Sequence, residues 1–265
     1  MVTLGVIFPP ELPPERLRSI AESADRAGLE QLWLWEDCFK ESGIAAAASA
    51  LAWTQRLTVG IGLLPVPLRN VALTAMELAT LERLFPGRVV AGIGHGVLDW
   101  MAQVGARAES PMTLLREYTD ALYQLLRGTT VTTSGRYVHL DRVALDWPPQ
   151  PAPPLLVGAV RPRTAALAGE LSDGVIFSGE TSLAALREVL PHMQDARAAA
   201  GRSAAADVVV FVPVEGGSSA TEVAARLAEF AAAGATHLIL LSVGGGASLE
   251  EFAAFVARDV RPLVD

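Results

Sequence analysis

The sequence predicts a single α/β domain folded as a closed (βα)8 barrel, the TIM-barrel architecture. Short apolar runs alternate along the chain with longer segments in which apolar residues recur three and four positions apart. A strand followed each time by a helix makes a parallel sheet, and eight such units close the sheet into a barrel. The length of 265 residues and the hydrophobic share of 51% suit one barrel spanning residues 1–265.

Glycines and prolines divide the first half of the chain into units. Pro9 and Pro10 stop the first apolar run, and Gly28 ends the first helical stripe. The predicted elements, each strand before its helix, are Thr3–Phe8 and Pro14–Ala27, Gln31–Trp35 and Ile44–Trp53, Leu57–Gly62 and Val71–Leu84, and Arg88–Ile93 followed by Leu98–Val104 and Met112–Leu126.

The second half begins with a departure from this rhythm. Thr130–Leu140, with Ser134-Gly135 at its centre, predicts a short β-hairpin between units four and five. The proline-rich stretch Pro148–Pro154 is too short for a domain linker. The remaining strands and helices are Pro154–Gly158 and Arg163–Leu171, Gly174–Phe177 and Leu183–Ala200, Val208–Val212 and Ala220–Ala233, and His237–Leu241 and Leu249–Val260.

Composition argues against several classes of function. The net charge of −8, without a basic cluster, argues against a nucleic-acid partner. The longest nearly apolar runs, Gly43–Trp53 and Leu57–Leu68, are too short to span a membrane. The single cysteine, Cys38, excludes an internal disulfide and fits a cytoplasmic location. Most histidines fall on predicted helices, the hairpin or a strand entrance, so we expect no metal site.

The active site of a (βα)8 barrel lies at the carboxyl ends of its strands. Strand four runs into Gly92-x-Gly94-His95-Gly96, where closely spaced glycines let the backbone approach a ligand. Glu36 and Asp37 follow strand two, and Arg161 and Arg163 follow strand five. Two carboxylates, a histidine and two arginines on one rim suit a large, partly aromatic and anionic ligand.

The order of several loose motifs is similar to that of the luciferase-like monooxygenase superfamily, and within it to the coenzyme F420-dependent oxidoreductases. Together these motifs cover nearly the whole chain. They are Ala27–Trp35 (AGLEQLWLW), Thr54–Gly62 (TQRLTVGIG), Ala79–Arg88 (ATLERLFPGR), Ala91–Gly96 (AGIGHG), Pro154–Ala159 (PLLVGA), Ala168–Gly174 (AGELSDG) and Ala233–Leu240 (AGATHLIL).

The resemblance implies a cofactor site, position by position. Family members back the deazaflavin or flavin ring with a bulge after strand three, often at a non-prolyl cis peptide. They contact the ring after strand four, where a histidine can donate a hydrogen bond or pair with phosphate. They receive the phosphate on amides of the turn into helix five. The corresponding residues are Gly62, Leu63, Gly94, His95, Gly96, Ala159, Val160, Arg161, Arg163 and Thr164.

Strand two departs from the family pattern. Many F420-dependent members end this strand with Asp-His, and that histidine is a proposed proton donor or acceptor, whereas this chain has Glu36-Asp37. A carboxylate shielded from water has a raised pKa and can act as an acid. Asp37, with Glu36 and His95, is therefore the predicted catalytic group. The alternative is that Glu36 and Asp37 form a solvated or salt-bridged loop pair.

The resemblance implies an F420-dependent oxidoreductase that moves hydride between the deazaflavin and a small organic substrate. One alternative is an FMN-dependent monooxygenase of the same superfamily. Another is a degenerate barrel that binds a ligand, or only a partner subunit, without catalysis. Family members are usually homodimers, so we expect a homodimer. The predicted pocket loops, Val97–Pro111 and Ser178–Ser182, indicate a partly apolar substrate.

Overall fold

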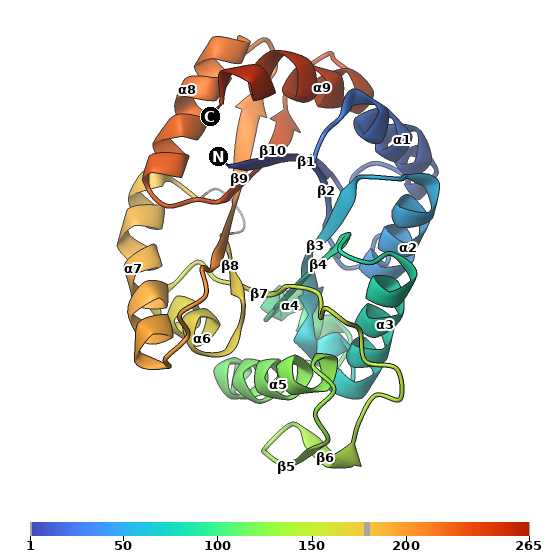
Figure 1. The fold of residues 1–265 in the computed structure, drawn as a ribbon, viewed down its shortest axis with the longest axis vertical. Coiled ribbons are helices and arrows are strands. Elements are labelled where there is room, and N and C mark those ends of the chain that lie inside the picture. Colours follow the sequence, from blue (N-terminus) through green and yellow to red (C-terminus); the bar gives the residue numbers. More distant parts are fainter. Residues whose placement is uncertain (1, 178–180, 265) are drawn as a thin grey trace.

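Eight parallel strands form a closed barrel in the computed structural model, which describes residues 2–177 and 181–264 (Figure 1). The strands are β1 (Thr3–Phe8), β2 (Gln31–Leu34), β3 (Thr58–Pro65), β4 (Val89–Gly94), β7 (Leu155–Gly158), β8 (Gly174–Phe177), β9 (Asp207–Glu215) and β10 (His237–Val243). They pair in this order around the barrel, and β10 returns to β1. The predicted (βα)8 fold is confirmed.

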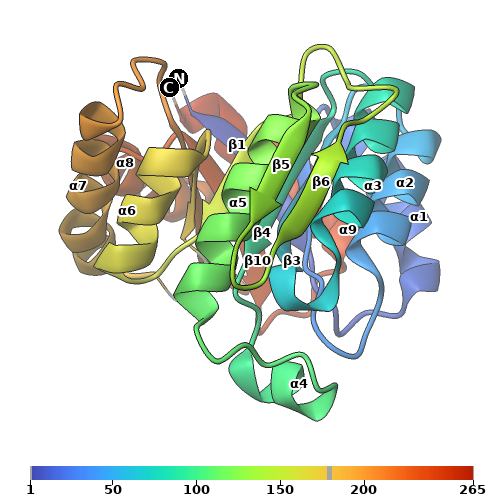
Figure 2. The same cartoon turned by 90° about the horizontal axis from the view of Figure 1, so that it is seen from below.

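The helices surround the barrel on its outside (Figure 1). They are α1 (Leu17–Ala27), α2 (Gly43–Trp53), α3 (Val71–Leu84), α4 (Leu98–Gln103), α5 (Pro111–Leu126), α6 (Pro162–Leu171), α7 (Leu183–Ala199), α8 (Ala220–Ala232) and α9 (Leu249–Phe255). The short α4 differs from the others because it lies beyond one end of the barrel (Figure 2). It belongs to the long connection from β4 to α5.

Apolar side chains from all the barrel strands except β3 fill the interior, namely Ile7, Trp33, Val90, Leu156, Ile176, Val209, Phe211 and Ile239. The largest of them, Trp33, fits because β3 has glycine beside it. A Cβ atom on Gly60 would lie 2.4 Å from Trp33 Cδ2, which is too close for any side chain. The indole Nε1 of Trp33 donates to Gln31 Oε1 at 2.8 Å, so this buried donor is satisfied.

The ladder between β3 and β4 is irregular where the resemblance implies a bulge. Its register shifts between Ile61 and Leu64, and the Gly62-Leu63 peptide bond is cis. β3 therefore continues to Pro65 instead of ending at Gly62 as predicted. β9 and β10 also extend beyond their predicted ends, because Val214 and Glu215 still pair with Ser242 and Val243.

The end of the chain also differs from the prediction. α9 is α-helical only to Phe255 and continues as a π-helical turn over Val256–Val260, so the predicted helix Leu249–Val260 changes hydrogen-bond pattern midway. A 3-10 turn, Arg261–Leu263, follows. The core residues Val256 and Val260 remain buried through this change.

The predicted hairpin between units four and five is confirmed as β5 (Val131–Ser134) and β6 (His139–Val143). It lies on the outside of α5 (Figure 2). The Glu117 carboxylate on α5 accepts hydrogen bonds from the amides of Arg136, Tyr137 and Val138, at 2.9, 2.8 and 3.1 Å. These bonds fasten the hairpin tip to the barrel.

Among the described residues, no helix is long and apolar enough to cross a membrane. In the same part of the chain, no group of three or more His, Cys, Asp and Glu side chains is placed to hold a metal ion.

Candidate active site

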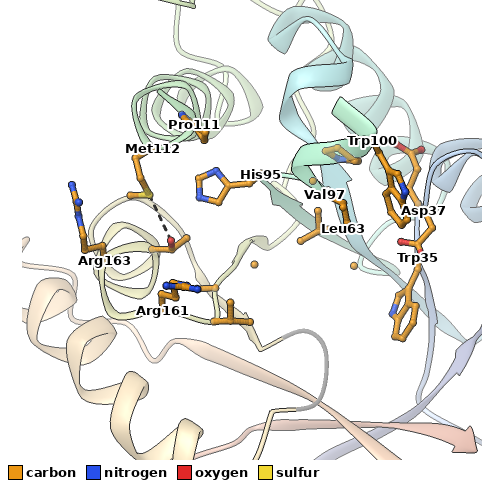
Figure 3. Close-up of a pocket in the computed structure, with 18 of the residues that line it drawn as sticks. Trp35, Asp37, Leu63, His95, Val97, Trp100, Pro111, Met112, Arg161 and Arg163 are labelled. Carbon is orange, nitrogen blue, oxygen red and sulfur yellow. Dashed lines mark hydrogen bonds between the residues drawn. The ribbon is translucent and has the colours of Figure 1, made fainter. Parts of the chain in front are cut away.

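A cavity of about 1020 Å³ lies at the carboxyl ends of the strands (Figure 3). Its walls come from the ends of β3 and β7, from the segments after β2, β4 and β7, from β9, from α4, and from the starts of α5 and α6. The predicted site residues on these walls are Glu36, Asp37, Gly62, Leu63, His95, Gly96, Ala159, Val160, Arg161, Arg163 and Thr164. Positions far apart in the sequence thus meet in one cavity. Of the predicted pocket loop Ser178–Ser182, residues 178–180 lie outside the described residues.

Gly94 is the predicted site residue that is not on the cavity wall. A Cβ atom at Gly94 would lie 2.7 Å from Leu63 Cδ2, and one at Gly158 would lie 2.3 Å from the same atom. Leu63 therefore occupies space that only glycine at these two positions leaves open. The structure gives Gly94 a packing role beneath Leu63, and its predicted contact with a cofactor stays a prediction.

Glu36 is held in an ion pair. Its carboxylate is buried and accepts from both terminal nitrogens of Arg69, with Nη2 at 2.8 Å from Oε2. The same carboxylate accepts from the amide of Gly43 at 2.7 Å, at the first turn of α2. Arg69 also faces Glu77 on α3, with 3.3 Å between Nε and Oε2. Bidentate binding fixes the position of the carboxylate, so these contacts make Glu36 an anchor for the segment after β2. They match the salt-bridged alternative for this residue.

Asp37 lines the same cavity, but its electrostatic surroundings differ from those of Glu36. Burial raises the pKa of its carboxyl group; Lys40 opposes this shift and Glu11 adds to it. Lys40 is itself bound to Glu11, with 2.8 Å between Nζ and Oε1. Within the described residues, no hydrogen bond engages the Asp37 carboxylate. A half-buried carboxyl group with a raised pKa can carry a proton to or from a ligand.

His95 lies between the two sides of the cavity, just after β4 (Figure 3). Burial lowers the pKa of its imidazole, and the backbone carbonyl of Pro111 partly opposes this effect. Its Nδ1 is buried and has no hydrogen-bond partner in the structure. A lowered pKa keeps the ring neutral at neutral pH, which favours a hydrogen bond to a polar ligand edge over an ion pair with phosphate.

Aromatic rings line the opposite side. The Trp35 and Phe211 rings are 5.6 Å apart between centroids and inclined by 31°, and Phe211 also meets Trp33 edge-on at 5.6 Å. The buried Nε1 of Trp35 has no hydrogen-bond partner in the structure. A buried donor without a partner is costly. A ligand acceptor would relieve this cost.

The start of α6 forms the third part of the site. Arg161 is the N-cap residue, Pro162 opens the helix, and no side chain caps its first amides. Arg161 and Arg163 are exposed and make no ion pair with another described residue. Thr164 is buried, and its Oγ1 lies 3.6 Å from Met112 Sδ (Figure 3). Uncapped amides and two guanidinium groups attract an anion.

These features fit a large ligand that has a flat ring and an anionic group. The Gly62-Leu63 segment offers an apolar wall, and His95 offers an unpartnered polar atom beside it. The arginines and amides at α6 offer an anion site.

Sequence reasoning missed several residues on or near the cavity. Phe211 lies two residues after Val209 on β9, and both side chains point into the barrel. The alternation of side chains along a strand is the signal that could have found Phe211. Trp35 directly follows β2, and its sequence position did signal the rim. Arg69 gave no such signal, because its role depends on Glu36, which lies 33 positions away in the sequence.

The family model for luciferase-like monooxygenases matches residues 3–258. A 5,10-methylenetetrahydromethanopterin reductase of Methanolobus tindarius is 28% identical over 67% of this chain and 54% of its own length. An F420-dependent glucose-6-phosphate dehydrogenase of Kineococcus radiotolerans is 32% identical over 73% of this chain and 61% of its own length. The chain thus spans little more than half the length of these curated relatives.

Solved structures show the same fold at low identity. An F420-dependent secondary alcohol dehydrogenase in complex with an F420-acetone adduct has a TM-score of 0.89 at 17% identity, covering 100% of this chain and 99% of its own. The oxygenating constituent of 3,6-diketocamphane monooxygenase from Pseudomonas putida, in complex with FMN, has a TM-score of 0.80 at 16% identity, covering 100% and 99%. By the family match over nearly its whole length, the chain belongs to the luciferase-like monooxygenase family.

Proposed function

We propose that this protein is a coenzyme F420-dependent oxidoreductase that transfers hydride between the deazaflavin and a small organic substrate. The observation that carries the proposal is the arrangement of the cavity. A flat wall at Gly62-Leu63 and an anion-attracting turn at Arg161 and Arg163 face one space, with His95 between them. The names of the relatives, F420-dependent enzymes among them, support this cofactor.

Each part of the cavity has a role in this proposal. When bound, the deazaflavin supplies the carbon that gives or takes hydride. Leu63 and its peptide bond back the ring, while Arg161, Arg163 and the first α6 amides hold the phosphate. Neutral His95 donates or accepts one hydrogen bond at the polar ring edge. Asp37 carries the substrate proton, and Arg69 fixes Asp37 in place through Glu36. Trp35 and Trp100 keep water away from the reacting atoms.

FMN is the second candidate cofactor, because a family fold neighbour holds FMN. Titration of the purified protein with F420 and with FMN, followed by the fluorescence of each cofactor, separates the two. We expect saturable F420 binding at micromolar concentrations and no saturation with FMN. The reverse preference would make the protein a flavin enzyme. Binding of neither cofactor would leave only the degenerate barrel.

We also propose that residues 1–265 act as one domain and that the protein is a cytoplasmic homodimer. The single cysteine, Cys38, cannot form a disulfide within the chain, which fits that compartment. The outward face of α3 supports a dimer, because Leu73 and Met76 are 47% and 58% exposed and Leu84 follows two turns later. Light scattering after size exclusion should give twice the chain mass of 27.9 kDa. Met76→Arg should then give the monomer, and a monomeric wild type would contradict the proposal.

A further inference from the structure

The two sides of the cavity carry opposite chemistry. Figure 3 draws Arg161 and Arg163 on one side and Trp35, Asp37 and Trp100 on the other, with His95, Leu63 and Val97 between them. The arginine side suits an anionic group. We call the other side, formed by Trp35, Asp37 and Trp100, the aromatic–acidic side. It is the space that remains for a second ligand once the first occupies the arginines.

The aromatic–acidic side has an excess of negative charge. Its Asp37 has no cation bound to it, because Lys40 pairs with Glu11 and Arg69 pairs with Glu36 and Glu77. Glu41, four residues beyond Asp37, is half-buried and its Oε1 is buried without a hydrogen-bond partner. The segment after β2 and its neighbours therefore hold more carboxylates than cations. An anionic substrate here would be repelled by like charge in a partly dehydrated space. The repulsion energy there is several times what it would be in water.

The ring surfaces on this side favour another class of ligand. Trp35 packs against Phe211, and Trp100 projects from α4 over the same cavity. Indole faces bind flat apolar rings and attract cations. The unpartnered Nε1 of Trp35 can donate to a carbonyl or hydroxyl oxygen. The ring faces themselves favour neither a carboxylate nor a phosphate, because the face of an aromatic ring is electron-rich.

We propose that the substrate side of this cavity selects ring-containing organic molecules that are uncharged or cationic, and that it rejects anionic substrates such as sugar phosphates. Calling the selected molecule a substrate rests on the proposed F420-dependent function. The selectivity itself belongs to the cavity and is measurable without catalysis. Asp37 is the residue that sets the preference for charge, and Trp35 and Trp100 set the preference for rings.

Three probes that share one ring system test this inference by isothermal titration calorimetry. They are 1-naphthalenemethanol, which is neutral, 1-naphthylmethylammonium, which is cationic, and 1-naphthoate, which is anionic. With the F420-loaded protein, we expect the neutral and cationic probes to bind about tenfold or more tightly than naphthoate. Asp37→Asn should weaken the cationic probe several-fold and leave the neutral probe within about twofold. Naphthoate binding as tight as that of the neutral probe would overturn the inference.

A matched control uses Glu109, a carboxylate of the cavity wall that lies outside the segment after β2. Glu109 is exposed and pairs with Arg136, so Glu109→Gln should leave the binding of all three probes unchanged. An equal loss of the cationic probe in Glu109→Gln and in Asp37→Asn would overturn the role of Asp37. If F420 does not bind, the proposed function fails, and the probes are then tested on the cofactor-free Arg161→Ala/Arg163→Ala protein. The same charge order there would still support the selectivity.

Discussion

The two ends of the barrel treat their charged side chains differently. At the amino end of the strands, Arg197 donates to the carbonyls of Ser172 and Ala204 at 2.9 and 3.0 Å, and Arg88 donates to Leu57, to the Thr54 carbonyl and to the Thr54 hydroxyl. Asp173 accepts from Arg127, Arg202 and the amide of Leu155. Each of these charged side chains therefore joins two or more of the segments that connect strands and helices.

At the carboxyl end, several charged groups and hydrogen-bonding atoms that face the cavity have no partner among the described residues. Arg161 and Arg163 have no ion pair within the described chain, and His95 Nδ1 and Trp35 Nε1 are buried without partners. Glu36 is the contrasting case at this end, because Arg69 and Gly43 engage it completely. Unsatisfied groups reduce stability, and a ligand in the cavity would supply partners to these two buried atoms. The amino end stabilises the fold, and the carboxyl end is available for binding.

The largest expected effect on stability comes from Arg197→Ala at the amino end. The side chain is 7% exposed, and its removal leaves the Ser172 and Ala204 carbonyls without their donors. We expect a loss of about 2–4 kcal/mol in the free energy of unfolding, measured by urea denaturation. F420 affinity in the folded protein should not change. Arg187→Ala, an exposed arginine on the same helix, is the control and should stay within about 0.5 kcal/mol of wild type.

The reverse result is expected for Arg161→Ala/Arg163→Ala at the carboxyl end. Both side chains are exposed and form no ion pair with a described residue, so the unfolding free energy should remain within about 0.5 kcal/mol of wild type. F420 affinity should fall about tenfold or more, equivalent to about 1.4 kcal/mol. The control replaces Arg187 and Arg258, two exposed arginines away from the cavity. Unchanged affinity in the first variant would move the phosphate elsewhere, for example to the Gly244–Gly246 turn after β10.

The sequence predicts the helices and strands better than it predicts the contacts between remote segments at the two ends of the barrel. Hydrophobic periodicity depends on neighbours along the chain, so it predicted α3 with both ends correct and β8 likewise. It placed the end of β3 too early, because the bulge at Gly62-Leu63 is enforced by pairing with β4. A strand end shows which residues reach the rim, which is why nearly all the predicted site residues line the cavity.

What the sequence could not supply were contacts between remote segments. Gly94 looked like a cofactor contact because it belongs to a glycine cluster, yet Leu63 covers it. Glu36 and Asp37 are adjacent and chemically alike, and only Arg69, more than thirty positions away, distinguishes the anchor from the open carboxyl group. The separation of the two carboxylates into different roles is therefore a tertiary effect.

A small effect on stability, opposite in sign to that of Arg197→Ala, is expected from Asp37→Asn. Burial raises the pKa of Asp37, so its ionised form is less stable in the folded protein than in the unfolded chain. The stability associated with the protonated form is complete below the unfolded pKa of about 3.9, and it is lost as the pH rises through the higher folded pKa. Asparagine cannot ionise. The variant should therefore be slightly more stable than wild type at pH values above the folded pKa, with the gain shrinking as the pH falls toward the unfolded pKa.

Urea denaturation at a series of pH values measures this difference, and Asp99→Asn, a substitution of an exposed carboxylate on α4, is the control that should show no such gain. The same Asp37→Asn protein should reduce substrate more slowly, while its F420 affinity stays that of wild type. A variant that gains stability as it loses activity indicates a carboxyl group kept in place for chemistry at a cost to the fold. If Asp37→Asn instead lost stability at every pH, Asp37 would be an anchor like Glu36, and the contrast between the two ends of the barrel would lose its clearest member.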